Sequence, residues 1–195
     1  MNILALQGSP RKKGNTSYFL NIILEEIRNA GIDTKTVHVV DKNIKPCISC
    51  FSCQKQGNYK CAISDDFLEL AENIKMADLI VLASPVYWFG ITGFLKTVID
   101  RFYCLVKFDR DAGRIKSQLE GKGLAIVITA GSDAFSGADL IVQSFIRIAE
   151  FCDMNYLGTI GAYGINSIDD IKNNNTLIKD ARTFANKLLF NKSCY

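Results

Sequence analysis

Two stretches of this 195-residue sequence carry side chains that could do chemistry, and the first is a polar loop near its start. The loop covers residues 8–14 and holds three consecutive cations, Arg11, Lys12 and Lys13. Residues of good helix-capping type, Asn15, Thr16 and Ser17, follow it. The first N–H groups of a helix have no intrahelical partner, and the helix dipole adds about half a positive charge there. With hydroxyl groups nearby and the Arg11 guanidinium as a bidentate donor, the stretch predicts a site for a phosphate monoester.

This loop lacks the other common phosphate-binding patterns. It reads G-x5-G-N-T, so no lysine follows the second glycine as a Walker motif requires, and it contains no G-x-G-x-x-G. An ordinary turn between a strand and a helix, with a solvated basic tip, is the alternative interpretation.

The second stretch contains four cysteines, Cys47, Cys50, Cys53 and Cys61, with the spacing C-x2-C-x2-C-x7-C. The first three match the spacing of bacterial ferredoxins, whereas the fourth is more distant and no proline follows it. Three thiolates at two-residue gaps can surround part of one cubane cluster, and a flexible loop can bring the fourth back to it. The spacing therefore favours an iron–sulfur site.

Three alternatives are open for these cysteines. Zinc sites usually show two separate C-x2-C pairs, whereas here the pairs share Cys50. Any C-x2-C pair can form a redox disulfide, and the loop can also hold no metal at all. The single histidine, His38, excludes a multi-histidine metal site. The remaining cysteines share no spacing and are expected to be unliganded: Cys104, Cys152 and Cys194.

Composition limits what kind of protein surrounds these two stretches. The chain is 48% hydrophobic and 22% charged, which is typical of a globular protein, and its length fits one domain over residues 1–195. A net charge of +3 is too small to indicate nucleic-acid binding. With neither a signal-peptide pattern nor an apolar run of roughly 18 residues, we expect a cytoplasmic protein with no membrane span, in which seven cysteines do not form a disulfide framework.

Strand-like and helix-like segments alternate along the chain and must position both stretches. Strands are expected at residues 2–7, 34–40, 78–83, 123–130 and 155–162. Helices are expected at residues 15–29, 92–102 and 138–151, and another runs from a cap at 64–66 to about residue 76. A last helix is expected to end at about residue 190, with a break near 173–175. Residues 103–121 have mixed charges and no clear period, and are expected to be irregular.

Five apolar strands that alternate with helices predict an α/β fold, a doubly wound parallel sheet covered on both faces. The strand order 2-1-3-4-5 suits five strands, and a ligand then binds where the order reverses, beside the first and third strands. The cysteine-rich insertion, residues 41–66, follows the second strand.

In this order three loops meet at one edge of the sheet. The loop after the third strand holds three adjacent aromatic residues, Tyr87, Trp88 and Phe89, and the loop after the fourth is rich in small residues. A phosphate site at the first loop and a flat aromatic slot at the second fit flavin mononucleotide (FMN). The alternative for the aromatics is a hydrophobic loop packed on a helix.

The sequence also resembles a known family over residues 1–164. Gly8-Ser9-Pro10-Arg11 with Gly14-Asn15-Thr16, Ser84-Pro85-Val86-Tyr87-Trp88, and Lys96 to Arg101 (KTVIDR) are similar to the flavodoxin-like NAD(P)H-dependent FMN reductases. The cysteine spacing resembles the iron–sulfur flavoproteins, a branch of that family. There the motif implies a [4Fe–4S] cluster that exchanges electrons with FMN, usually across a subunit interface.

Carried over by position, the resemblance implies site residues for each part of FMN. The phosphate would be bound by Ser9, Arg11, Asn15, Thr16 and Ser17. The ribityl chain and one edge of the isoalloxazine would contact Pro85, Val86, Tyr87, Trp88, Phe89 and Gly90. The pocket would be closed by Thr129, Ala130 and Gly131.

The resemblance implies an FMN-dependent oxidoreductase of the iron–sulfur flavoprotein type, with NAD(P)H or a ferredoxin-like protein as donor. It would act on a small-molecule or protein acceptor, as a homodimer or homotetramer. Two other functions are open: a cluster-free NAD(P)H-dependent FMN or quinone reductase, and a flavodoxin-like electron carrier. No catalytic acid, base or nucleophile is expected, because the flavin supplies the hydride and electron chemistry.

Overall fold

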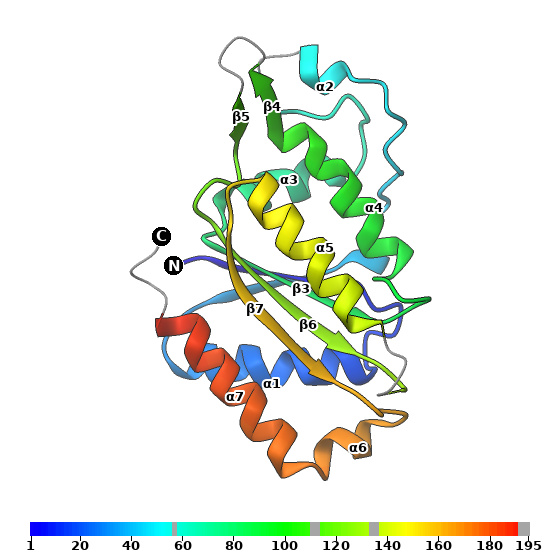
Figure 1. Cartoon of the computed structure of the whole chain (residues 1–195), viewed down its shortest axis with the longest axis vertical. Coiled ribbons are helices and arrows are strands. Elements are labelled where there is room, and N and C mark those ends of the chain that lie inside the picture. Colours follow the sequence, from blue (N-terminus) through cyan, green and yellow to red (C-terminus); the bar gives the residue numbers. More distant parts are fainter. Residues whose placement is uncertain (56–57, 110–113, 133–136, 191–195) are drawn as a thin grey trace.

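The expected parallel sheet forms the centre of the computed structural model, which describes residues 1–55, 58–109, 114–132 and 137–190 (Figure 1). Its strands are β1 (Ile3–Gln7), β2 (Thr34–His38), β3 (Leu79–Pro85), β6 (Gly123–Thr129) and β7 (Asn155–Ala162). They pair in parallel in the order β2-β1-β3-β6-β7, which confirms the predicted order. Cys194 and the loop residues 133–136 lie outside the described residues.

Helices cover both faces of this sheet (Figure 1). On one face lie α1 (Asn15–Asn29), α6 (Ile168–Lys172) and α7 (Asn175–Phe190). On the other lie α3 (Phe67–Met76), α4 (Gly93–Arg101) and α5 (Ala138–Phe151). Alternate residues of each central strand enter opposite cores, so Ile80 packs under α3 and α4 whereas Val81 packs under α1. This burial on both faces explains why the strands read as continuous apolar runs.

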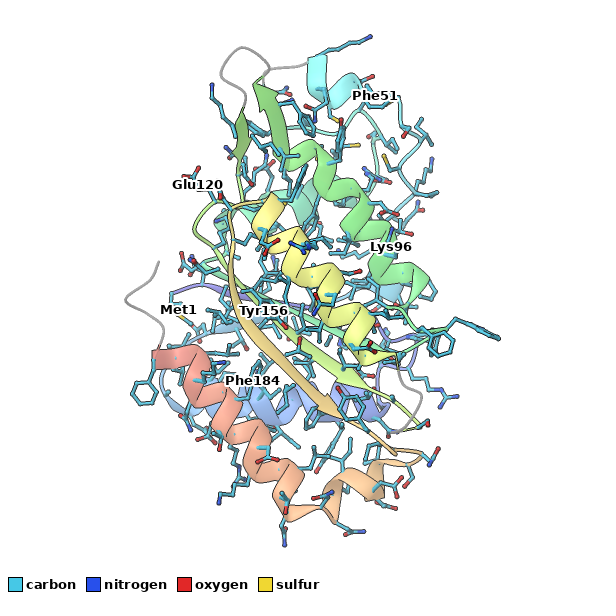
Figure 2. The ribbon with its side chains drawn as sticks, in the orientation of Figure 1. Met1, Phe51, Lys96, Glu120, Tyr156 and Phe184 are labelled. Atoms are coloured by element: carbon cyan, nitrogen blue, oxygen red, sulfur yellow. The ribbon has the colours of Figure 1, made fainter. Side chains whose placement is uncertain are left out.

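The C-terminal helix is broken where the sequence predicted it. Helix α6 has a capping box at Ser167 and ends at Lys172, and the Asn174 side chain then accepts a hydrogen bond from Leu177 N at 2.9 Å. Asparagine competes with helical backbone hydrogen bonding in this way, which explains the interruption. Phe184 of α7, labelled in Figure 2, is buried in the core that α7 shares with α1.

Residues 103–121 are more regular than expected. A 3-10 turn, η2 (Phe102–Leu105), leads into an antiparallel hairpin of β4 (Val106–Asp109) and β5 (Arg114–Ser117). Phe108 pairs with Ile115 and Lys107 with Lys116, so each strand alternates apolar and charged residues. Four residues per strand are too few for that alternation to stand out among the charges around it.

The cysteine-rich segment follows β2 through a 3-10 turn, η1 (Val39–Asp41), and includes one short helix, α2 (Ser52–Lys55). In Figure 1 the segment runs beside α4, and α2 lies next to β4, at the opposite end of α4 from the loop that follows β3. Helix α4 thus joins the aromatic loop at its start to the cysteine-rich segment at its end.

Candidate functional site

The loops after β1, β3 and β6 meet at the carboxyl edge of the sheet, as predicted, and enclose a pocket of about 260 Å³. It is lined by Ser9, Arg11, Gly14, Asn15, Thr16, Pro85, Val86, Tyr87, Thr129, Ala130, Gly131, Ile165 and Asn166. The edge lies where the strand order reverses, the usual ligand position in such sheets.

The first loop is anchored to α4 at Gly8. Gly8 N donates to Ala83 O at 2.8 Å, and Gly8 O accepts from the Thr92 hydroxyl at 2.6 Å. A Cβ atom at Gly8 would lie 2.7 Å from Leu95 Cβ, so only glycine fits this contact. Because the Thr92 hydroxyl also accepts from Leu95 N at 3.3 Å as the N-cap of α4, one side chain fixes both the loop and the helix start.

The rest of the first loop folds around the carbonyl of Arg11. That oxygen accepts from Gly14 N at 3.1 Å and from the Ser17 hydroxyl at 3.2 Å. Ser9 Oγ accepts from Arg11 N at 3.1 Å. These bonds hold the backbone in a tight turn, while the Arg11 side chain is exposed at the pocket.

Helix α1 begins without a side-chain cap. Its N-cap is Gly14, so the expectation that Asn15, Thr16 and Ser17 act as capping residues was wrong. Their side chains bind across the site instead: Thr16 Oγ1 lies 2.6 Å from Thr129 Oγ1, and the Ser17 hydroxyl accepts from the buried Gln7 amide at 2.7 Å. The first helical N–H groups therefore keep their donor capacity for an anion.

The loop after β3 forms a tight hairpin turn. Tyr87 and Gly90 exchange two backbone hydrogen bonds at 2.8 and 3.0 Å, and φ is +47° at Trp88 and +63° at Phe89. Both central residues thus adopt left-handed backbone, as in type I′ turns. A Cβ atom at Gly137 would lie 2.7 Å from the Phe89 ring, so the turn packs directly against the start of α5.

The three aromatics are not part of the hydrophobic core. Tyr87 is 48%, Trp88 94% and Phe89 51% exposed, although Phe89 packs against the start of α5, as the alternative of a hydrophobic loop packed on a helix expects. They line an apolar groove of about 350 Å³ beside the polar pocket, together with residues of α4 and α5 such as Ile99 and Leu140. The pocket and the groove share Tyr87, so a polar and an apolar compartment adjoin at this residue.

Most predicted cofactor-binding residues therefore line the polar pocket. Four do not: Ser17 is buried behind it, and Trp88, Phe89 and Gly90 line the groove. Ile165 and Asn166 complete the pocket but were missed, because they follow the last strand in a segment without a family pattern.

A buried ion pair closes the base of the cysteine-rich segment. The Arg101 guanidinium is bound by both oxygens of Asp65, at 2.8 and 3.0 Å, and both side chains are at most 1% exposed. A cap for α3 was predicted at residues 64–66; its N-cap is Asp66, whose side chain makes no capping bond, while Asp65 Oδ1 accepts from Phe67 N at 3.1 Å. Burial alone would raise the pKa of Asp65, but hydrogen bonds from Arg101 and from Lys45 N lower it below its usual value.

The four predicted ligands are only partly assembled. Cys53 is buried and Cys61 half-buried, whereas Cys47 and Cys50 are exposed. Among the described residues, no three metal-ligating side chains stand close enough to hold an ion. Cys50, Cys53 and Cys61 are nevertheless near enough for their charges to interact, and burial raises the pKa of Cys53.

Cys104 is a neighbour that its sequence position did not indicate. It is buried in η2, and burial together with the charges of Cys61 and Cys53 raises its pKa to about 12. The link between η2 and α2 is Gln54, whose amide donates to Tyr103 O at 3.0 Å and Val106 O at 2.9 Å. These contacts join segments about 50 residues apart in the chain, so no spacing pattern in the sequence could indicate them.

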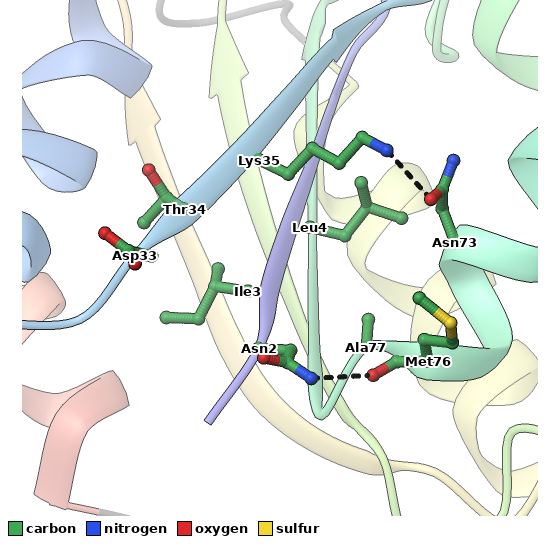
Figure 3. Close-up of a pocket in the computed structure, with 9 residues that line it drawn as sticks. All are labelled: Asn2, Ile3, Leu4, Asp33, Thr34, Lys35, Asn73, Met76 and Ala77. Atoms are coloured by element: carbon green, nitrogen blue, oxygen red, sulfur yellow. Dashed lines mark hydrogen bonds between the residues drawn. The ribbon is translucent and has the colours of Figure 1, made fainter.

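A second cavity, of about 320 Å³, lies at the opposite edge of the sheet, where β1 and β2 begin (Figure 3). Two polar side chains in it bind within the protein: Lys35 Nζ donates to Asn73 Oδ1 at 2.8 Å, and Asn2 Nδ2 donates to Met76 O at 3.3 Å. The cavity touches none of the three converging loops. Over the described ranges, no helix is both long and apolar enough to cross a membrane.

Comparison with known proteins identifies similar chains. The family model for NADPH-dependent FMN reductase matches residues 1–164. An iron–sulfur flavoprotein of Methanocaldococcus jannaschii is 31% identical, covering 96% of this chain and 95% of that protein. An iron–sulfur flavoprotein of Archaeoglobus fulgidus is 38% identical, and the match covers 74% of this chain and 69% of that protein. The FMN-dependent NADH-azoreductase of Bacillus anthracis, solved with FMN, superposes with a TM-score of 0.67 at 16% identity, covering 96% and 99%.

Proposed function

We propose that this protein passes electrons between FMN and a [4Fe–4S] cluster in its cysteine loop. The premise is that the chain belongs to the NADPH-dependent FMN reductase family and is an FMN-dependent oxidoreductase. The fold is flavodoxin-like. We also propose that residues 1–195 act as one domain and that the protein works in the cytoplasm.

The uncapped start of α1 is the observation that carries the FMN assignment. It presents helical N–H groups to a polar pocket that also receives the Arg11 side chain. A dianionic phosphate fits this arrangement, because N–H donors and a guanidinium complement its charge. The proposed phosphate ligands are Ser9, Arg11, Asn15 and Thr16, with Ser17 holding the loop from behind.

The groove beside the pocket suits the flavin ring. Its walls are apolar, and it begins at Tyr87, where the polar pocket ends. We assign ribityl and ring contacts to the backbone and side chains of residues 85–90, and closure of the pocket to Thr129, Ala130 and Gly131. The hydrogen bond from Val86 N to Thr129 O at 2.9 Å holds these two loops together.

The protein's part in the reaction is to bind, orient and shield. FMN held there would supply the hydride and electron chemistry that links NAD(P)H to one-electron or two-electron acceptors. The turn at Trp88 and Phe89, fixed against Gly137, sets the position of the groove wall. The Gly8–Thr92 contact keeps the phosphate loop in register with α4, and hence with the groove.

The cysteine loop fits a cluster by its donors and its closure. It offers four thiols between two ends that the Asp65–Arg101 pair joins, and Cys53 lies within electrostatic reach of Cys50 and Cys61. Binding would require the exposed Cys47 and Cys50 to turn inward. Similarity to iron–sulfur flavoproteins over nearly the whole chain supports this assignment over zinc or a disulfide.

A homodimer would bring the two sites together. Helix α4, about 13 Å long at 1.5 Å per residue, separates the aromatic loop from the cysteine loop within one chain. A row of aromatic rings continues from the groove along this face, with successive ring centroids 5.6–6.0 Å apart: the exposed Phe151 and Phe108, the half-buried Tyr103 and the exposed Phe51. Phe51, labelled in Figure 2, lies at the end of this row beside α2. A two-fold axis across the row would place the Trp88 end of one copy against the Phe51 end of the other.

The two other functions predict different behaviour. A cluster-free FMN or quinone reductase would oxidise NAD(P)H rapidly with no iron bound, and a flavodoxin-like carrier would not oxidise NAD(P)H. Anaerobic turnover of NADPH and of NADH, with a quinone or a ferredoxin-type protein as partner, separates these functions.

Replacement of Arg11 by alanine is expected to weaken FMN binding by roughly 10- to 150-fold. A charge-assisted hydrogen bond contributes roughly 1.5–3 kcal/mol, and Arg11 is the exposed cation at the phosphate pocket. Titration of the apoprotein with FMN and with riboflavin measures both affinities. Riboflavin lacks the phosphate, so equal weakening of the two ligands would contradict the assignment. Lys12→Ala is the matched control, because Lys12 instead pairs with Asp41 at 2.7 Å.

Quenching of Trp88 fluorescence is expected when FMN binds. Trp88 is the only tryptophan and is 94% exposed beside the groove, so its emission reports directly on this loop. Unchanged emission at saturating FMN, with binding established by equilibrium dialysis, would show that the flavin lies elsewhere.

A further inference from the structure

Arg101 is the largest fully buried side chain of the described residues. The hydrogen bonds and the ring contact of its guanidinium are made with the cysteine-rich segment and with the start of α3, the helix that follows it. Nη1 donates to Lys45 O at 2.8 Å, two residues before Cys47. Nη2 donates to Ile63 O at 3.4 Å, two residues after Cys61. One guanidinium therefore binds both ends of the segment that contains all four proposed ligands.

Asp65 completes this clasp. Besides the bidentate pair with Arg101, its Oδ2 accepts from Lys45 N at 2.8 Å. The guanidinium also stacks on the Phe67 ring, 4.3 Å from its centroid, which fixes its plane. The arrangement cannot shift without leaving a buried charge unpaired, so the loop ends are held at fixed separation.

The charge of Arg101 also faces the loop interior. Its guanidinium binds the carbonyl of Ile63, two residues after Cys61, and is close enough to Cys61 for their charges to interact, while Nε is buried with no hydrogen-bond partner among the described residues. No other buried arginine or lysine is found in the described parts of the chain. A buried positive charge beside a thiolate ligand stabilises the more negative, reduced form of a cluster.

We propose that Arg101 is the positioning residue of the cysteine loop: it fixes both loop ends for cluster binding and places the charge that raises the cluster's reduction potential. This inference rests on the proposed function for its second half only. The first half concerns the protein chain alone and is tested without metal.

The test compares wild type with Arg101→Lys, which keeps the charge but loses the bidentate fork, and Arg101→Met, which loses both. Arg182→Met is the matched control, because Arg182 lies on α7 and is 62% exposed. In iron-free, FMN-bound protein, hydrogen–deuterium exchange at residues 43–47 and 61–66 should accelerate at least about tenfold in both Arg101 variants. Exchange at wild-type rates would overturn the positioning role.

The second readout is the cluster potential in anaerobically reconstituted protein, followed by electron paramagnetic resonance during redox titration. Arg101→Met should shift it to lower values, whereas Arg101→Lys should stay nearer wild type and the control should not move. Equal potentials in wild type and Arg101→Met would overturn the electrostatic role. If Arg101→Met does not fold, the same contrast is measured between wild type and Arg101→Gln.

Failure of the proposed function gives a different result. Wild-type protein that binds no iron would remove the cluster and with it the electrostatic role, while the exchange measurement would still decide whether Arg101 holds the loop.

Discussion

The substitution Cys53→Ser is expected to reduce bound iron from about four atoms per chain to nearly none, while FMN remains bound. Serine replaces a soft thiolate with a poor ligand for iron, and Cys53 is the most buried of the four proposed ligands. Serine at Cys47, Cys50 or Cys61 should lower iron content as well. FMN should be retained, because its loops lie at the other end of α4. Iron, acid-labile sulfide and flavin are counted per chain after anaerobic reconstitution.

The matched control is Cys104→Ala. Cys104 is a buried cysteine within electrostatic reach of Cys53 and Cys61, so it tests whether any thiol loss near the loop disturbs the cluster. Full iron in this variant and none in Cys53→Ser is the expected pair of results. Equal iron in both would refute the ligand assignment.

Asparagine at Asp65 is expected to lower the free energy of unfolding at pH 7 by about 3–5 kcal/mol, because it leaves the Arg101 charge buried and unpaired. The effect should depend on pH. The pKa of Asp65 in the folded protein is lower than the 3.8 of an ordinary aspartate, so its stabilisation is complete at neutral pH and is lost as the pH falls below about 4.

Urea unfolding of the two proteins at pH 7 and at several values between pH 5 and pH 2 measures this difference. The difference in free energy of unfolding between wild type and Asp65→Asn should become smaller as the wild-type carboxylate becomes protonated. A gap that stays constant down to pH 2 would show that the loss comes from packing and not from the carboxylate charge.

The fold was predictable because its central strands are buried on both faces and its helices are amphipathic. Apolar runs such as residues 123–129 leave few alternatives to a central parallel strand, and the strand order then places three loops at one edge. The hairpin of β4 and β5 was not predicted because its pairing depends on tertiary contacts. Tyr103 and Phe151 pack against Phe108, and Phe151 is distant from Phe108 in sequence.

The site was predictable in its loops and less so in its side chains. The phosphate loop was found from residue types, but the sequence could not show that Thr16 would bind Thr129 and Ser17 would bind Gln7, since these partners belong to different strands. The pair of Asp65 and Arg101 spans 36 residues and also escaped the sequence reasoning. Asp65 suits a helix cap and Arg101 suits a solvated helix end, so only the packed structure reveals their joint role.

The measurement that tests the central claim most directly is the visible spectrum of protein purified without oxygen, with FMN, iron and sulfide counted per chain. We predict one FMN together with about four iron and four sulfide, and a broad cluster absorption beneath the flavin bands. Protein with stoichiometric FMN but no iron or sulfide, even after reconstitution, would contradict the cluster and leave a plain flavin reductase.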